Sequence, residues 1–530
     1  MSQLARRDLI KLAVSGASAG IFGIPWEAAA QMAKGGVLVI GSTQRPRHLN
    51  PGVQSGTATM VPGAQIFASP LRMDANWKPQ PYLAERWDLS PDFRSVTLQL
   101  RKDAVFHDGR PITTEDLKFS IELVRDNHPF KSMYAPVNAV TISDAHTAVV
   151  RLSQPHPALL LAMSTSLTPI LPKHIFGDGV DPKVHPRNNN PVGSGPFKVV
   201  EFKPDERLVL ERFDKFFFKD APKLERIIIQ YFKDPSSMLL AFERGEIDTC
   251  AEFIDAREVE RVRKVPGVQA LANSGPAIGP LVWLAFNTKN PKLADKRVRQ
   301  AISYAIDRKF VIDSLLGKLH KRSTGPIASG SPFYSADVQH YELDLAKSAK
   351  LLDEAGLKPS ANGVRLALDL DCIPGTAATK TIQEYLKPAL AKVGIEVNVR
   401  FSPDFPSWAR RVAGGQFDMS LDVVYNWGDP VIGVHRTWLT SNIKPGVIWS
   451  NTQGYSNPKV DELLDAASQE MNLTKRKAMY KEFQKLVVDD CPCTFLFETT
   501  FTGAYRGNVQ NPPNGIWGIS DAILSTSMKS

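Results

Sequence analysis

The chain has 530 residues, of which 43% are hydrophobic and 22% are charged, and its formal net charge is +9 at pH 7. A chain of this length and composition can bury ample apolar surface and should form two or more domains. Lys and Arg are scattered among Asp and Glu without a run of about five or six like charges, which argues against nucleic acid as a partner.

The N-terminal segment has the layout of an export signal. Arg6-Arg7 precedes an apolar run from 12 to about 24, and Ala28-Ala29-Ala30 has the small residues of a signal peptidase site. This order predicts a twin-arginine signal over residues 1–30. A cytosolic helix that happens to contain two arginines is the alternative.

The mature chain would then start near Gln31. No cysteine precedes Cys250, so we expect a soluble periplasmic protein without a lipid anchor. No later segment approaches the roughly 18 uninterrupted apolar residues of a membrane span.

The first half of the mature chain predicts strands, turns and one well-marked helix. Residues 36–41 predict a buried strand that opens into a polar turn at 42–46, and Thr113-Thr114-Glu115-Asp116 predicts a helix start. The loop-rich stretch from 181 to 195 predicts a subdomain boundary. Further strands are expected at 95–101, 197–200, 208–210 and 227–231, and a second mixed region at about 141–152 again alternates apolar and polar residues.

Beyond about residue 283, helices and strands alternate. This order predicts βαβ units and a largely parallel sheet with helices on its faces. The expected helices are 295–316, 344–355, 377–393, 406–413, 458–470 and 473–488, and the expected strands are 364–370, 395–401, 417–424 and 494–501.

The four cysteines are too few for a disulfide scaffold. Cys491-Pro-Cys493 could form a strained disulfide or bind a soft metal, but no second pair completes a metal set by spacing. We expect structural roles for both, and we expect Cys250 and Cys372 to be buried thiols.

Motifs along the whole mature chain resemble the peptide-type extracytoplasmic solute-binding proteins, the family that includes dipeptide, oligopeptide and nickel-complex binders. They are found in the family's order and span more than 400 residues. They are Leu49-Asn50-Pro51, Leu83-Ala84-Glu85-Arg86-Trp87, Phe106-His107-Asp108-Gly109, Pro191-Val192-Gly193-Ser194-Gly195-Pro196, Gly245-Glu246-Ile247-Asp248, Arg297-Val298-Arg299-Gln300-Ala301, Leu351-Leu352-Asp353-Glu354-Ala355-Gly356 and Tyr455-Ser456-Asn457-Pro458.

The resemblance implies an α/β, two-lobe periplasmic-binding-protein fold, type II, of the large class with an extra subdomain in the first lobe. On this map residues 31–280 and 495–530 form the first lobe, with the insertion at about 71–190, and residues 281–494 form the second. The lobes would close by a hinge over a peptide or other small-molecule ligand. The protein would be a monomer without cofactor or metal, and it would deliver the solute to ABC permease subunits in the inner membrane.

The resemblance also points to a site where cleft loops meet, at strand ends. The best candidate follows the strand that ends at Val424 and contains Tyr425, Asn426, Trp427 and Asp429. In peptide-binding relatives an Asp four positions before the corresponding proline pairs with the peptide's α-ammonium. Asn426 occupies that position and carries no charge. This departure favours a peptide-sized cargo over a simple peptide.

Other residues complete the expected site. Arg436 could clamp a carboxylate or phosphate, although pairing with a surface carboxylate is the alternative. By resemblance, Gln44 and Arg45 reach the cleft from the end of the first strand, and Trp283 stacks on the solute. We expect Trp427 to be an aromatic wall, whereas Trp408 is expected to lie in the core.

The G-x-S-x-G pattern at Gly16-Ala17-Ser18-Ala19-Gly20 lies in the apolar core of the predicted signal and is therefore discounted, and the other motifs of common enzymes are missing from the chain. It contains no H-E-x-x-H, no G-x-x-x-x-G-K-[ST] and no dinucleotide fingerprint, and His107-Asp108-Gly109 is expected to be a turn. We therefore expect a binding protein rather than an enzyme. Opine-like or other anionic solutes and metal chelates are alternatives to a peptide, and an exported hydrolase or chaperone-like protein is the alternative class.

Overall fold

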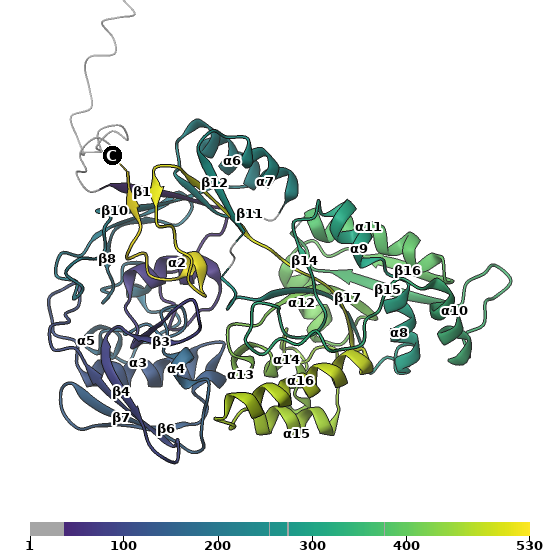
Figure 1. Ribbon diagram of the computed structural model, residues 1–530, viewed down its shortest axis with the longest axis horizontal. Helices are drawn as coiled ribbons and strands as arrows, with labels where there is room; N and C mark the ends of the chain where they lie inside the picture. The colour runs from purple at the N-terminus through teal and green to yellow at the C-terminus, as the bar shows by residue number, and fades with distance from the viewer. Residues whose placement is uncertain (1–35, 254, 273–274, 376, 530) are drawn as a thin grey trace, which may run out of the picture.

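The computed structural model describes residues 36–253, 255–272, 275–375 and 377–529 of the chain. The predicted export signal over residues 1–30 lies outside them. The described chain forms two lobes side by side, with β1 and α2 in one lobe and β15 and α16 in the other (Figure 1).

The first lobe is built on a mixed seven-stranded sheet. The central strand β1 runs parallel to β10 and β11, whereas β19 lies antiparallel between β11 and β12. Helices α2 (Thr57–Ile66), α6 (Pro235–Arg244) and α7 (Ala256–Arg263) belong to this lobe. In sheet order the strands are β12 (Val268–Ala272), β19 (Thr502–Arg506), β11 (Thr249–Phe253), β1 (Val37–Ser42), β10 (Arg226–Tyr231), β9 (Arg207–Arg212) and β8 (Phe197–Lys203).

Local sequence explains where helices of the first lobe start and stop. In α6, the Asp234 side chain accepts a hydrogen bond from the Ser237 N–H, and Gly245 ends the helix with φ at 82°. The expected helix start at Thr113 is confirmed, because Thr113 and Asp116 form a capping box for α3 (Thr114–Asn127).

An inserted subdomain carries a second, four-stranded sheet. It is antiparallel, and α3 contacts its edge strand β6. Its strands are β4 (Ala84–Leu89), β5 (Ser95–Leu100), β7 (Thr147–Leu152) and β6 (Val137–Ile142). Smaller elements nearby are β2 (Leu71–Met73), β3 (Pro79–Pro81), η1 (Lys131–Tyr134), α4 (Leu159–Ala162), α5 (Lys173–Phe176) and η2 (Pro186–Asn189).

Close packing against the end of α2 explains why glycine occupies positions 193 and 195 of the Pro191–Pro196 motif. A Cβ on Gly193 would lie 1.9 Å from the Ile66 carbonyl oxygen, and one on Gly195 would lie 2.5 Å from the Gln65 carbonyl oxygen. The Gly195 N–H also donates to the Ile66 carbonyl at 2.8 Å. The motif therefore fastens the end of α2, and only glycine permits that approach.

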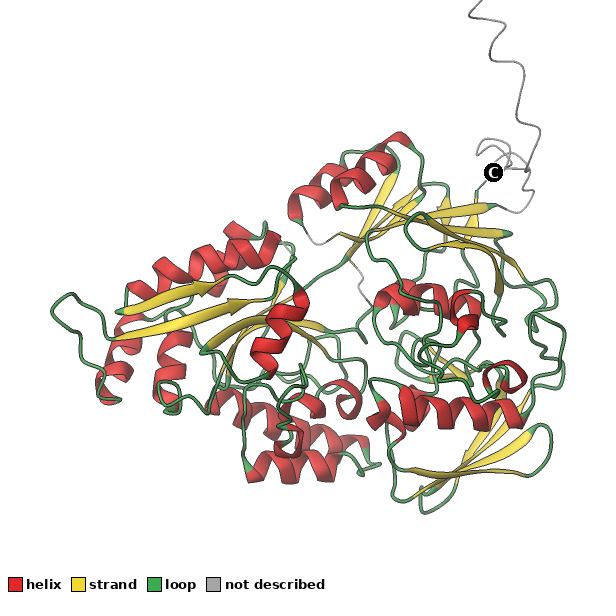
Figure 2. Cartoon of the chain, turned by 180° about the vertical axis from the view of Figure 1, so that it is seen from behind, coloured by secondary structure: helices red, strands yellow, loops and turns green. Residues whose placement is uncertain are grey.

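The second lobe contains a six-stranded sheet with helices on both sides (Figure 2). Its strands, in sheet order, are β14 (Lys321–Arg322), β18 (Cys493–Glu498), β13 (Pro280–Phe286), β17 (Met419–Tyr425), β15 (Leu366–Cys372) and β16 (Ile395–Arg400). Its helices are α8 (Lys296–Tyr304), α9 (Arg308–Phe310), η3 (Val311–Leu315), α10 (Leu345–Glu354), α11 (Ala377–Ala391), α12 (Phe405–Ala413), α13 (Pro430–Gly433), α14 (His435–Trp438), η4 (Thr440–Asn442), α15 (Pro458–Ala467) and α16 (Leu473–Asp490).

Two expectations for this lobe are corrected. The sheet is mixed rather than largely parallel, because β15 pairs in parallel with β16 and β17, but β13 lies antiparallel between β17 and β18. The single helix expected over 295–316 is broken, since Asp307 starts a new helix by capping Phe310 and a π-helical turn follows. Strands β13 and β18 are far apart in the sequence, so the alternation of helices and strands along the chain could not reveal their antiparallel pairing.

The chain passes between the lobes in extended segments. Strand β13 opens the second lobe at Pro280, and β18 remains in that lobe's sheet to Glu498. The next strand, β19, pairs in the first lobe's sheet, so the return occurs at residues 499–501, a few residues later than the expected 495. The yellow C-terminal part of the chain makes this passage in Figure 1 and ends with β20 (Val509–Gln510), η5 (Gly518–Ser520) and β21 (Ser527–Met528).

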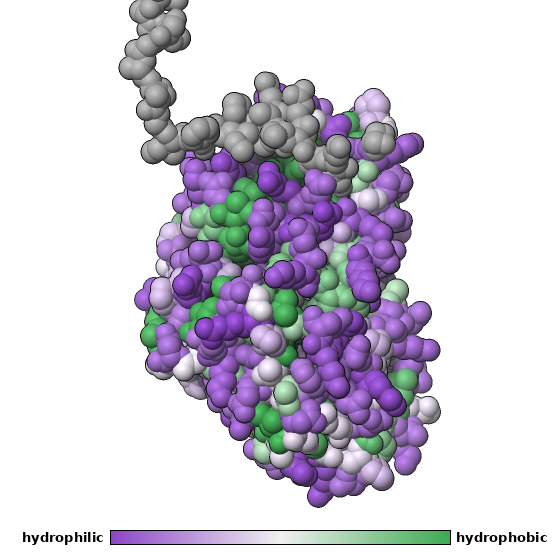
Figure 3. All heavy atoms as spheres, turned by 90° about the vertical axis from the view of Figure 1, so that its left-hand side faces the viewer, coloured by the Kyte–Doolittle hydropathy of each residue, from purple (hydrophilic) through white to green (hydrophobic). Residues whose placement is uncertain are grey.

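Each lobe has its own hydrophobic core. The face of the first lobe seen in Figure 3 is mainly hydrophilic, with hydrophobic residues in small separate groups. Among the described residues, no helix combines the length and the apolar character needed to cross a membrane.

Candidate ligand site

The candidate site is a pocket in the second lobe, at the carboxyl ends of β15 and β17. Thr499 and Phe501, from the passage back to the first lobe, form part of its wall. Sites in open α/β folds lie outside the carboxyl ends of strands, which is where this pocket opens. The lining residues are Val282, His320, Ile373, Pro374, Ala378, Thr379, Ile382, Leu421, Asp422, Val423, Tyr425, Phe497, Thr499 and Phe501.

His320 forms an aromatic part of the wall. Its ring stacks on Phe497, with ring centroids 4.9 Å apart and planes 5° apart. Its Nδ1 accepts a hydrogen bond from the Thr500 N–H at 3.2 Å, which places the proton of a neutral ring on Nε2. Burial lowers the pKa of His320 to about 4, so the ring is uncharged at neutral pH.

Asp422 borders the pocket, but its carboxylate is bound elsewhere. Side chains alternate along β17, so Asp422 points to the opposite face from Leu421 and Val423. Its two oxygens accept hydrogen bonds from the Trp449 indole N–H at 3.2 and 3.0 Å. Burial raises the pKa of Asp422 to about 7.

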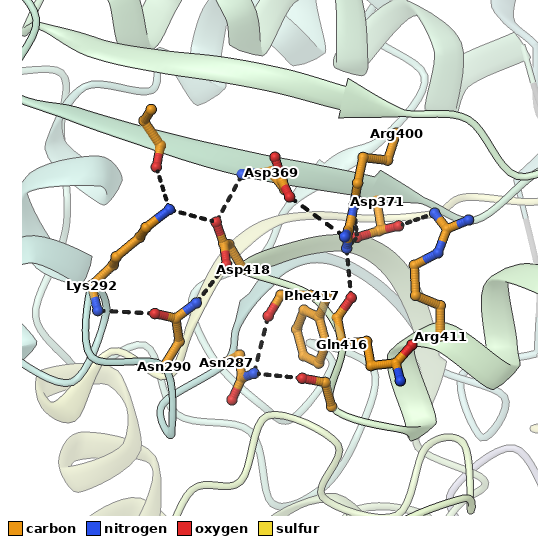
Figure 4. Close-up of polar contacts among 12 residues, drawn as sticks. Asn287, Asn290, Lys292, Asp369, Asp371, Arg400, Arg411, Gln416, Phe417 and Asp418 are labelled. Atoms are coloured by element: carbon orange, nitrogen blue, oxygen red, sulfur yellow. Dashed lines mark hydrogen bonds and ion pairs between the residues drawn. The ribbon is translucent and has the colours of Figure 1, made fainter.

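Another carboxylate at this edge of the sheet is paired within the protein (Figure 4). The fully buried Asp371, near the end of β15, forms ion pairs with Arg400 and with Arg411, the latter at 2.6 Å. At the opposite end of β17, Asp418 lies 3.5 Å from the Lys292 ammonium and accepts a hydrogen bond from the Asp369 N–H. These contacts tie β15, β16 and β17 together, and both carboxylates are bound within the protein.

The loop that follows β17 is held by protein groups. Asn426, 4% exposed, accepts a hydrogen bond from the Ala328 N–H at 2.6 Å and donates to the Pro326 carbonyl at 3.2 Å. Both ends of its amide therefore bind a second-lobe loop. A role in which this side chain faces the solute has no support in these contacts.

Trp427 and Asp429 lie in the seam between the lobes. The Trp427 ring packs 5.2 Å from Phe130 of the inserted subdomain and belongs to the first lobe's core. Asp429 forms a bidentate ion pair with Arg476 of α16, with both N···O distances at 2.6 Å. Both carboxylate oxygens are thus used inside the protein.

Arg436 also lies in this seam. Its Nε donates to the Trp449 carbonyl at 3.1 Å, and its guanidinium lies 5.4 Å from the Phe130 ring centre. Burial lowers the pKa of Arg436 to about 10. Within the part of the chain that the structure describes, no carboxylate forms an ion pair with it.

The remaining predicted residues are apart from the pocket. Gln44 and Arg45 are exposed at the carboxyl end of β1, where Arg45 pairs with Asp205 at 3.3 Å. Trp283 is 2% exposed and packs edge-on against Trp438 in the second lobe's core, so the structure gives it a packing position. The core position expected for Trp408 is confirmed by its complete burial.

Of the eight predicted site residues, only Tyr425 lines the pocket. Sequence reasoning missed His320 and the residues of the return passage. The strand end at Ile373 and Pro374 could have been included, because the preceding strand was expected. His320 follows no strand or motif that marks it.

The four cysteines lie in the packed interior of the protein. All four cysteines are free and buried, as expected for Cys250 and Cys372. Burial raises the pKa of Cys491 and of Cys493, which keeps both thiols protonated. No group of three or more metal-binding side chains is found among the described residues.

Known proteins share this architecture. The oligopeptide-binding protein AppA of Bacillus subtilis is 25% identical over 485 residues, which cover 88% of this chain and 86% of AppA. The crystal structure of NikZ from Campylobacter jejuni in complex with Ni(L-His) matches with a TM-score of 0.80 and 25% identity, covering 92% of this chain and 97% of NikZ. NikA from Brucella suis in complex with Fe(III)-EDTA matches with a TM-score of 0.80 and 26% identity, covering 92% and 98%.

These similarities confirm the expected two-lobed type II fold. The family model for bacterial extracellular solute-binding proteins, family 5, matches residues 78–446. The match begins in the inserted subdomain, continues through strands β8 to β12 of the first lobe and includes most of the second lobe. The chain therefore belongs to the family 5 bacterial extracellular solute-binding proteins.

Proposed function

We propose that this protein is the solute-binding component of a bacterial ABC importer and captures a peptide-sized solute for delivery to a membrane permease. The observation that carries the proposal is the pocket at the carboxyl ends of β15 and β17, which shares Thr499 and Phe501 with the passage between lobes. A solute there would touch the segment at 499–501 that joins the two lobes. Membership of family 5 supports the same role.

The mechanism is binding followed by closure. A solute that rests on the second lobe gains contacts with the first lobe only when the lobes approach. Its differential affinity for the closed state then shifts the population toward closure. The permease would recognise the closed form, and no covalent bond of the solute changes.

The cargo is proposed to be peptide-sized rather than a simple peptide. The relatives named above differ in what they bind, from oligopeptide to Ni(L-His) and Fe(III)-EDTA. Asn426 brings no charge to the position where peptide binders carry Asp, and its amide is bound by the loop at 326–328. At the pocket itself the Asp422 carboxylate is bound by Trp449, so an α-ammonium would lack a free counter-charge there.

The test is to identify the bound solute. Native mass spectrometry of the protein purified from its own periplasm should show an added mass, and the released compound should raise the melting temperature of stripped protein. A solute at 1,000 times its Kd stabilises the protein by about 4 kcal/mol. Recovery of a chemically altered compound would contradict binding without turnover, and the absence of any stabilising solute in periplasmic extract would contradict the proposal.

We further propose export through the twin-arginine route, based on the Arg6-Arg7 signal. Replacing both arginines by Lys preserves charge and should leave the precursor in the cytoplasm. Lys11→Arg is the matched control and should be exported normally. Periplasmic delivery of the Arg6→Lys/Arg7→Lys variant would exclude this route.

A further inference from the structure

The pocket wall is dominated by apolar side chains. Strands β13, β17 and β18 and helix α11 all contribute to it, as do two residues that follow β15. The apolar members are Val282, Ile373, Pro374, Ala378, Ile382, Leu421, Val423, Phe497 and Phe501. A solute group that enters therefore leaves water for a hydrocarbon and aromatic surface.

The acidic groups around the pocket are already bound by protein donors. Asp422 points to the other face of β17 and accepts hydrogen bonds from Trp449. Glu498, at the end of β18, accepts from the Ser329 hydroxyl at 2.6 Å and from the Ser329 N–H at 2.8 Å. A cation in the pocket would not find a free carboxylate among these groups.

Among the described residues, no Lys or Arg lines the pocket either. The ring of His320 is the nearest candidate for a cation, but its Nδ1 already accepts from the Thr500 N–H and its face lies on Phe497. A neutral histidine in this position adds an aromatic surface instead of a charge. An anion in the pocket would thus lack a counter-ion.

We propose that this pocket selects cargo carrying an uncharged aromatic or branched aliphatic group, which it buries against the second lobe. This inference rests on the proposed function for its biological role, but the selectivity itself is a property of the pocket. Burying a charged group there would lower its affinity several-fold or more, since no opposite charge among the described lining residues compensates for the lost hydration.

Three probes of the same shape test the selectivity. Benzyl alcohol is neutral, benzylamine is cationic and benzoate is anionic at pH 7. Ligand-observed NMR titration should show benzyl alcohol binding at least about tenfold more tightly than either charged probe. Equal or tighter binding of benzylamine or benzoate would overturn the inference.

Variants at Ala378 test whether benzyl alcohol binds in this pocket. Ala378 lines it from the first turn of α11, whereas Ala391, the last residue of that helix, is exposed. Ala378→Trp should abolish benzyl alcohol binding by filling the space, and Ala391→Trp should preserve it. Unchanged binding by a folded Ala378→Trp variant would place the probe elsewhere and refute the proposal.

A charge-switch variant gives a second, independent readout. Ala378→Asp adds a carboxylate to the pocket, and an acidic residue is favourable in the first turn of a helix, so folding should be retained. The preference should invert, with benzylamine now binding more tightly than benzyl alcohol; Ala391→Asp should not invert it. An uninverted preference contradicts the proposal. The mass spectrometry experiment tests solute capture and does not depend on this preference. The proposed function and the proposed selectivity can therefore be refuted independently.

Discussion

Replacing Arg476 by Met should destabilise the protein strongly at pH 8. Arg476 donates to both oxygens of Asp429 at 2.6 Å, and the two side chains are only 4% and 8% exposed. Burial disfavours the Asp429 carboxylate, but the charge and hydrogen bonds of Arg476 outweigh this effect, so the pKa of Asp429 is lowered. Removal of the guanidinium leaves a buried carboxylate without a partner.

The expected loss is about 3 to 5 kcal/mol of unfolding free energy, the usual cost of removing one partner from a buried ion pair. Removing the charge on both sides should cost less. The double variant Arg476→Met/Asp429→Asn is therefore expected to be more stable than Arg476→Met alone by about 2 kcal/mol or more.

The loss should also depend on pH. In Arg476→Met the pKa of Asp429 rises above its ordinary value, so the carboxyl is protonated in the folded protein at lower pH and the penalty shrinks as the pH falls. Urea unfolding followed by tryptophan fluorescence at pH 8 and pH 5 measures both effects. A loss below about 1 kcal/mol at pH 8, or a double variant no more stable than the single one, would refute the reasoning.

Three other substitutions or reactions have defined outcomes. Because the pKa of Asp422 is raised to about 7 in the folded protein, the wild type loses unfolding free energy as the pH rises from about 4 to about 7. The Asp422→Asn variant lacks this loss. Its unfolding free energy relative to wild type, measured by urea titration, should therefore rise by up to about 4 kcal/mol over that range. Gly193→Ala should lower the melting temperature by several degrees, since its Cβ would meet the Ile66 carbonyl oxygen at 1.9 Å, whereas equal melting temperatures would contradict this packing. Cys491 and Cys493 should react with a thiol reagent only after unfolding, and rapid labelling of the folded protein would show that they are accessible.

The family and the general architecture could be predicted from sequence because their signals are local. The capping box at Thr113 and Asp116 lies within a few residues, and the glycines of the Pro191–Pro196 motif stand in a recognisable order. Alternating helices and strands beyond residue 283 indicated an α/β lobe, and the strand end at Val424 marked the edge where a site is expected. Each of these signals depends on neighbours along the chain.

Tertiary structure alone decided which side chains form the pocket and which charges are free. His320 reaches the wall because it stacks on Phe497, a residue far away in the sequence. Asp429 and Arg476 are separated by 47 positions, so the sequence could not show that they pair and Asp429 was predicted to bind the ligand. In the folded protein its carboxylate forms an ion pair with Arg476. Asn426 is occupied in the same way by Pro326 and Ala328. Residue types showed which groups were available, but only the long-range contacts made on folding determine which of them are left for a solute.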